Sequence, residues 1–96
     1  MVSKGEVKDF ASIADLKEQV VKKKIPVIVD WWYWNGGHYS VVVDVDARKI
    51  SLQDPLIGRV HKMPVKDFER LWFDFKEEFV KSKDDLVVRR MIIISR

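Results

Sequence analysis

The chain of 96 residues contains no cysteine. Disulfide bonds, a thiolate nucleophile and cysteine-ligated zinc are therefore excluded within these residues. No apolar run approaches the roughly 20 residues that a membrane-spanning helix needs. The first nine residues carry charges where a signal peptide would be apolar. Together these absences predict a cytoplasmic protein with no membrane association.

Neither sign of charge dominates, because 18 basic and 15 acidic residues leave a net charge of +3. The basic residues are spread along the chain, so the composition does not favour nucleic-acid binding. Hydrophobic residues make up 47% and charged residues 34% of the sequence, which is typical of a globular protein. We expect a single domain over residues 1–96. No spacing typical of a metal or cofactor site is present.

The four glycines and three prolines are few, and most of them mark breaks between predicted elements. Apolar residues at helical spacing predict a helix that Ser12 caps and Pro26 ends. A second helix is predicted after Pro64, with its apolar stripe formed by Phe68, Leu71, Trp72, Phe75 and Phe79. Strands are expected over residues 27–31, 38–45, 50–54, 59–63 and 86–95, whereas residues 1–9 should be loose. This order predicts an α+β fold with a mainly antiparallel sheet of about four or five strands and two packed helices.

Alternation along the strands predicts which side chains share a face of the sheet. In the first strand, Ile28, Asp30, Trp32 and Trp34 should lie together. In the second strand, we expect the odd-numbered residues to belong to the core: Tyr39, Val41, Val43 and Val45.

His38 and Asp54 are the residues best placed for chemistry. If the intervening turn is centred near residues 46–48, the two side chains lie at the same open end of a hairpin. Asp54 would then fix the tautomer of the ring and leave one nitrogen free as a base. Gly36 and Gly37 would leave space beside the ring for a ligand or another backbone. A histidine beside an acid at a strand end is more often structural, so this pair alone does not establish catalysis.

An ordered set of short motifs resembles the C39-like peptidases of the papain-like cysteine peptidase superfamily. It comprises Pro26-Val27-Ile28-Val29, Gly37-His38-Tyr39 followed by valines, Asp54-Pro55 with Gly58, and Phe68 with Trp72. The resemblance covers roughly residues 12 to 75 and implies the sheet-bearing half of a papain-like fold. It also implies that His38 is the general base and that Asp54 orients it. We expect the cleft beside them to include Trp32, Trp34, Gly36, Gly37 and Tyr39.

The family's nucleophilic cysteine and a nearby glutamine belong to a helical half that should precede Phe10, where only nine residues stand. The serines are in the wrong positions to replace the cysteine, so the isolated chain should not hydrolyse peptides. Three hypotheses follow: a non-catalytic relative that binds a peptide or protein, the His/Asp part of a split or truncated peptidase, and a small nucleic-acid-binding module. Stacking of bases on residues 31–34 is the basis of the third, which we favour least.

Loss of the helical half also affects the predicted surface. The face that carries Ile28, Trp32 and Trp34 should lack part of its cover, and soluble monomers rarely leave such an apolar patch exposed. We therefore expect a homodimer or a partner chain over this face.

Overall fold

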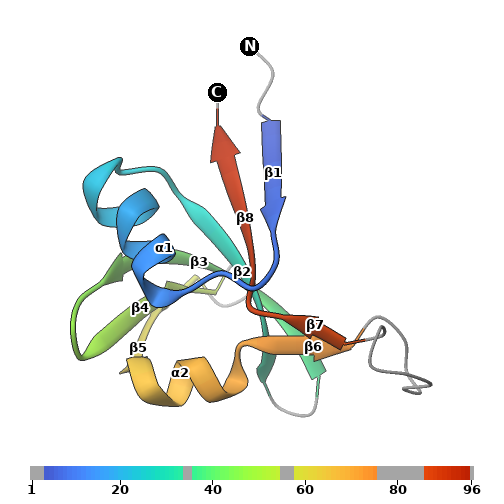
Figure 1. The fold of residues 1–96 in the computed structure, drawn as a ribbon. Helices are drawn as coiled ribbons and strands as arrows, with labels where there is room; N and C mark the ends of the chain where they lie inside the picture. The colour runs from blue at the N-terminus through green and yellow to red at the C-terminus, as the bar shows by residue number, and fades with distance from the viewer. Residues whose placement is uncertain (1–3, 34–35, 55–57, 76–85, 96) are drawn as a thin grey trace.

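The computed structural model describes residues 4–33, 36–54, 58–75 and 86–95. Its main sheet has six strands in the order β1-β8-β2-β3-β4-β5, and all neighbouring strands are antiparallel (Figure 1). The strands are β1 (Lys4–Lys8), β2 (Val27–Tyr33), β3 (Gly36–Val45), β4 (Lys49–Gln53), β5 (Val60–Pro64) and β8 (Arg90–Ser95). With two helices, this arrangement confirms the α+β prediction.

The first helix begins where the sequence predicted. Helix α1 (Ile13–Lys17) continues as a π-helical segment (Glu18–Lys22). Ser12 caps it: the backbone N–H of Asp15 donates to Ser12 Oγ at 3.1 Å, and the Ser12 N–H donates to the Asp15 carboxylate at 2.9 Å. This reciprocal pair satisfies two N–H groups that the first turn would otherwise leave without partners.

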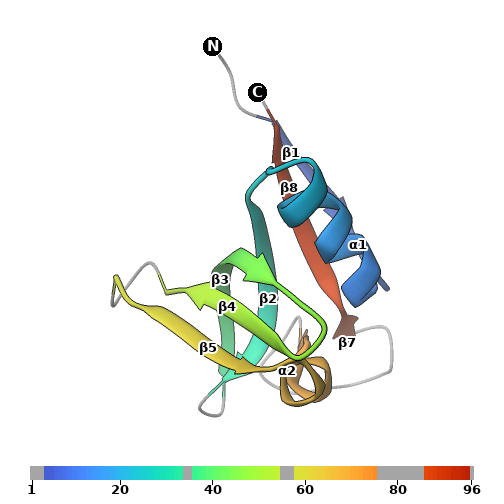
Figure 2. The ribbon, with the colours of Figure 1, turned by 90° about the vertical axis from the view of Figure 1, so that its left-hand side faces the viewer.

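One hydrophobic core lies between the helices and one face of the sheet. Leu16 of α1 and Phe68 of α2 (Val65–Leu71) are both fully buried against residues of β2, β3 and β4. In the view of Figure 2, α2 lies below α1. None of the helices in the described ranges is long and apolar enough to cross a membrane.

The expected core face of the second strand was wrong. Ser40 and Val42 are buried, whereas Tyr39 is 50% and Val43 is 43% exposed. The reason is that Ser40 and Val42 pair with Val29 and Val27 on β2, on the face that the helices cover. A bulge between Val42 and Asp44 then shifts the alternation by one residue. Val45 is consequently buried as well.

The second helix is shorter than predicted, because α2 ends at Leu71. The following residues form β6 (Phe73–Phe75), which pairs with β7 (Leu86–Val88). Long-range hydrogen bonds explain the change. The Trp72 indole N–H donates to the carbonyl of Arg90 at 2.9 Å, and the Trp72 carbonyl accepts from the N–H of Arg89. Phe75 is thus a strand residue, and Phe79 lies outside the described residues.

Two strand predictions also need correction. Residues 4–8 are not loose but form the edge strand β1, paired with β8. The expected final strand is divided at Arg89, which has a φ of 46°. At this break the chain leaves the small β6–β7 pair and enters the main sheet.

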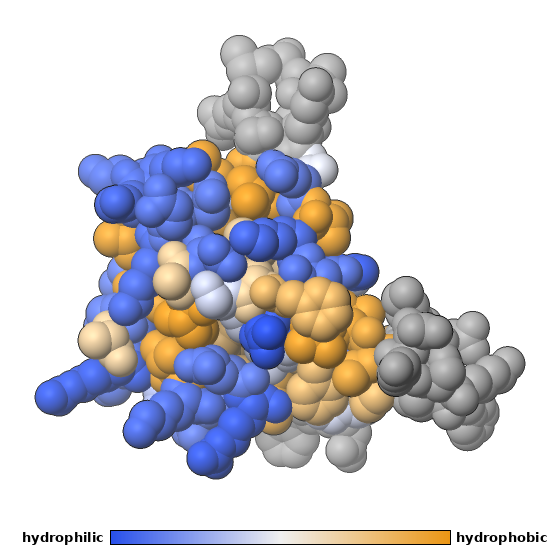
Figure 3. All heavy atoms as spheres, in the orientation of Figure 1, coloured by the Kyte–Doolittle hydropathy of each residue, from blue (hydrophilic) through white to orange (hydrophobic). Residues whose placement is uncertain are grey.

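The β6–β7 pair covers part of the sheet face opposite the helices. Trp32 of β2 stacks on Phe73, with ring centroids 5.7 Å apart, and meets Phe75 edge-on at 5.1 Å. Of the face that was expected to lack cover, Trp32 is therefore partly covered by this strand pair. On the side of the molecule seen in Figure 3, apolar side chains gather toward the β6–β7 end.

Candidate functional site

His38 and Asp54 lie side by side at the open end of the β3–β4 hairpin. His38 Nε2 is 2.7 Å from Oδ2 of Asp54, so the predicted proximity of the two side chains is confirmed. Their side chains are only 20% and 12% exposed. Because an ionised carboxylate can only accept, the Nε2–H of the ring donates to it and Nδ1 carries the free lone pair. A general base needs such an arrangement, in which an acid binds one ring nitrogen and leaves the other nitrogen free to accept a proton.

The backbone after β4 holds Asp54 in place. Its N–H donates to the carbonyl of Arg59 at 3.1 Å, and its carbonyl accepts from the N–H of Gly58 at 2.8 Å. Gly58 has a φ of +71°, in the left-handed region that favours glycine. The chain therefore returns on itself directly beyond Asp54, and β5 begins two residues after Gly58.

The aromatic side chains beside His38 are Trp31 and Tyr33. The backbone register places Trp31 opposite His38, and the two rings meet nearly edge-on with centroids 6.1 Å apart. Tyr33 lies 5.6 Å from His38 and stacks on Trp31 at 4.9 Å. The Trp31 indole N–H donates to Ser40 Oγ at 3.0 Å, and this bond fixes the orientation of the indole ring.

Several residues predicted for the cleft are elsewhere. Trp32 faces away from His38 and packs on β6, because neighbouring residues of a strand point to opposite faces. Tyr39 likewise lies on the opposite face from its neighbour His38. Gly37 leaves room there for the carboxylate of Asp74, and Gly36 has no neighbour within 4 Å of the position of a Cβ atom. Trp34 lies outside the described residues.

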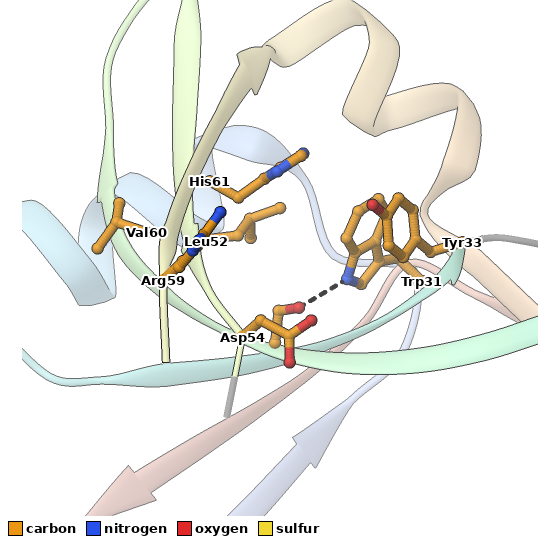
Figure 4. A pocket seen from close by; sticks show the side chains of 8 residues that line it. Trp31, Tyr33, Leu52, Asp54, Arg59, Val60 and His61 are labelled. Carbon is orange, nitrogen blue, oxygen red and sulfur yellow. Dashed lines mark hydrogen bonds between the residues drawn. The ribbon is translucent and has the colours of Figure 1, made fainter. Parts of the chain in front are cut away.

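A cavity of about 300 Å³ opens beside the pair (Figure 4). It is lined by Trp31, Tyr33, Ser40, Leu52, Asp54, Arg59, Val60 and His61. Sequence reasoning did not place Arg59, which directly precedes β5, or the β5 residues Val60 and His61 in the cleft. The available signal was the short strand predicted at residues 59–63: an antiparallel return beside β4 places His61 opposite Leu52.

Asp54 lines the cavity and His38 lies next to it through the hydrogen bond to Asp54, but no serine hydroxyl among the described lining residues is placed as a nucleophile. Ser40 is the serine nearest to His38 in sequence, but it is 2% exposed and already accepts from Trp31. Among the described residues, no group of three or more His, Cys, Asp or Glu side chains is arranged to hold a metal ion. Ser40, the one serine among the described residues that line the cavity, is therefore held by Trp31 and is not accessible from the cavity as a nucleophile would be.

A second titratable pair lies on the opposite face of the sheet, and sequence reasoning missed it. Asp30 of β2 is 2% exposed. Burial and then a hydrogen bond with Asp74 raise the pKa of Asp30 to about 7. The negative charge of Asp30 is the main cause that raises the pKa of the Tyr39 hydroxyl. Arg90 lies near the Asp30 carboxyl group, and its guanidinium donates two hydrogen bonds, of 2.7 and 3.0 Å, to the Asp9 carboxylate.

The chain was compared with known proteins. The model of the peptidase C39 family matches residues 6–79. Searches of curated proteins and of solved structures gave no match. The matched segment contains both His38 and Asp54 and covers most of the sequence. The chain therefore belongs to the peptidase C39 family.

Proposed function

We propose that this chain is a non-catalytic C39-family domain that binds peptide segments in the cavity beside His38 and Asp54. One observation carries the proposal: the 2.7 Å hydrogen bond between the two residues is retained beside an open cavity, in a sequence without cysteine. A cysteine peptidase needs a thiolate next to its base. Without it, the same groups can still recognise a peptide.

The tautomer of His38 supports recognition of a backbone. Because Nε2–H is bound to Asp54, the unprotonated Nδ1 is a hydrogen-bond acceptor. A peptide N–H is the complementary donor. The aromatic rings of Trp31 and Tyr33 add an apolar wall, and a mainly apolar cavity with a few oriented polar groups is typical of ligand sites.

The test uses four sets of capped tetrapeptides that are acidic, basic, apolar or neutral polar. Each set is titrated into the isotope-labelled chain, and NMR chemical shifts of the Trp31 indole N–H and the His38 ring are followed. We expect at least one set to shift both signals, and mass spectrometry should show every peptide intact. Absence of shifts with all four sets would contradict peptide binding. Cleavage that His38→Ala abolishes would contradict the non-catalytic assignment.

A second candidate is the His/Asp part of a peptidase that another segment completes with a cysteine. The observation in its favour is the free lone pair on His38 Nδ1, which is where a base would accept the proton of a thiol. Hydrolysis that appears only when a cysteine-bearing chain from the same source is added, and that His38→Gln removes, would support it. Binding with no cleavage under those conditions would favour the first proposal.

A further inference from the structure

The cavity beside His38 has two chemically different walls. Figure 4 shows Trp31 and Tyr33 on one side, with Arg59 and His61 across the cavity from them and Asp54 at its edge. The aromatic wall is rigid, since Trp31 is stacked on Tyr33 and bonded to Ser40. The β5 wall is basic and is anchored by the pairing of His61 with Leu52.

The charges of the cavity are not equally available to a ligand. The carboxylate of Asp54 is already bonded to His38 and only 12% exposed. The guanidinium of Arg59 is exposed and forms no ion pair with any residue in the described ranges. His61 meets Tyr33 edge-on at 6.1 Å, which leaves its ring at the boundary between the two walls. Arg59 is therefore the cation on this wall that is available to a ligand.

From this arrangement we infer that the cavity selects peptide segments in which an acidic side chain adjoins an apolar one. The acidic group binds Arg59, and the apolar side chain lies against Tyr33. A carboxylate matches the planar, two-pronged donor geometry of a guanidinium. This inference rests on the proposed function, because it specifies which peptides the same cavity takes.

A nucleic acid would also be attracted to the positive charge of Arg59, but it would need a different kind of surface around that charge. Sequence-independent binding of single strands needs aromatic faces on which bases stack and several cations along the backbone. Trp31 is only 2% exposed, and Tyr33 already covers one of its faces. Among the described residues, Arg59 is the one arginine that lines the cavity. These observations favour a peptide.

The experiment compares two probes of equal length, acetyl-Ala-Phe-Glu-Ala-amide and acetyl-Ala-Phe-Gln-Ala-amide. Dissociation constants are obtained from NMR shifts of the Trp31 indole N–H in the wild-type chain and in Arg59→Gln. Arg48→Gln is the matched control, because Arg48 is an exposed arginine in the turn at the far end of the β3–β4 hairpin. An eight-residue thymidine oligonucleotide is titrated separately.

We expect the wild-type chain to bind the glutamate probe about fivefold more tightly, which corresponds to the upper range for an exposed ion pair. That preference should weaken as salt is added, disappear in Arg59→Gln and persist in Arg48→Gln. Equal affinity for both probes in the wild type would overturn the inference and leave peptide binding intact. Failure of every tetrapeptide set to bind would instead overturn the proposed function. Tighter binding of the oligonucleotide at the same resonances would overturn both.

Discussion

At the residue scale, the hydrogen bond to Asp54 determines which nitrogen of His38 carries its proton. The carboxylate accepts from Nε2 at 2.7 Å, and its position is fixed by backbone bonds to Gly58 and Arg59. His61 lines the same cavity, but its ring is held mainly by contact with Tyr33. The two histidines of the chain therefore differ in how strongly their surroundings select a tautomer.

We predict that neutral His38 is the Nε2–H tautomer, because only that form donates to Asp54. Long-range ¹H–¹⁵N spectra distinguish the two tautomers directly. In Asp54→Ala the preference should be reduced, while the signals of His61 in the same spectrum should keep their pattern. A dominant Nδ1–H form in the wild-type chain would contradict the geometry on which the functional proposal depends.

At the element scale, the β6 strand depends on contacts with β2 and β3. Trp32 stacks on Phe73, and the Asp74 carboxylate occupies the space that a side chain at Gly37 would need. Gly37 thus serves the attachment of β6 and not the cavity beside His38. Gly36 and Gly37 are adjacent in sequence but have different steric constraints, because only at Gly37 would a Cβ atom meet the Asp74 carboxyl group.

Replacing Gly37 with alanine should therefore destabilise the fold. The added Cβ would meet the Asp74 carboxyl group, and overpacking of this kind costs about 1–3 kcal/mol. Gly36→Ala is the matched control, because no atom of the described residues lies within 4 Å of its Cβ position. The free energy of unfolding, measured with urea, should fall in Gly37→Ala and change much less in Gly36→Ala. Equal losses in the two variants would show that the contact with Asp74 is not the cause.

The stability of the contact between β6 and the main sheet should depend on pH, because Asp74 of β6 lies against Asp30 of β2. The pKa of Asp30 is raised from 3.8 to about 7 in the folded chain, so folding favours its protonated form. The stabilising contribution is therefore complete below about pH 4 and is lost as the pH rises through about 7. Asp74, Arg90, Asp9 and Tyr39 are the charged or titratable groups that face Asp30.

Asp30→Asn should remove much of this dependence, because the amide can donate to Asp74 at every pH. We expect the variant to gain stability relative to the wild type between pH 5 and pH 8, by on the order of a few kcal/mol. Urea unfolding at the two pH values measures this change. Asp67→Asn, at an exposed position of α2, should show no comparable change. A constant difference between wild type and Asp30→Asn across this range would contradict the assignment.

At the scale of the whole molecule, β1 and β5 form the two edges of the main sheet, and neither pairs with a further strand among the described residues. Unpaired edges can join to other strands, and Val7 on β1 and Val60 on β5 are 56% and 55% exposed. These edges replace the Trp32 face as the physical reason to expect self-association. Trp32 itself is partly covered by β6.

We predict that the chain is not a simple monomer at micromolar concentration. Static light scattering measures its mass directly, and the monomer has a mass of 11.3 kDa. A dimer should give twice that mass and should dissociate on dilution. A mass of 11.3 kDa that stays constant up to high concentration would refute self-association, and the functional proposal for the cavity would be unaffected.

The sequence by itself determined the features that depend on neighbours along the chain. The Ser12 cap and the hairpin that brings His38 to Asp54 follow from short segments. The hairpin turn is fixed locally, since Asp46 Oδ1 accepts from the N–H groups of Arg48 and Lys49 at 2.7 and 2.8 Å. Once the turn is fixed, strand pairing carries its register to the open end.

Only the tertiary structure decided which face of the sheet became the core and where the second helix ended. Alternation separates two sets of side chains, but it does not say which set the helices will cover, and a bulge at Val42–Asp44 changes the pattern midway. Helix α2 ends at Leu71 because Trp72 bonds to Arg89 and Arg90, residues far away in sequence. The same long-range pairing attaches β6 and brings Asp74 to Asp30.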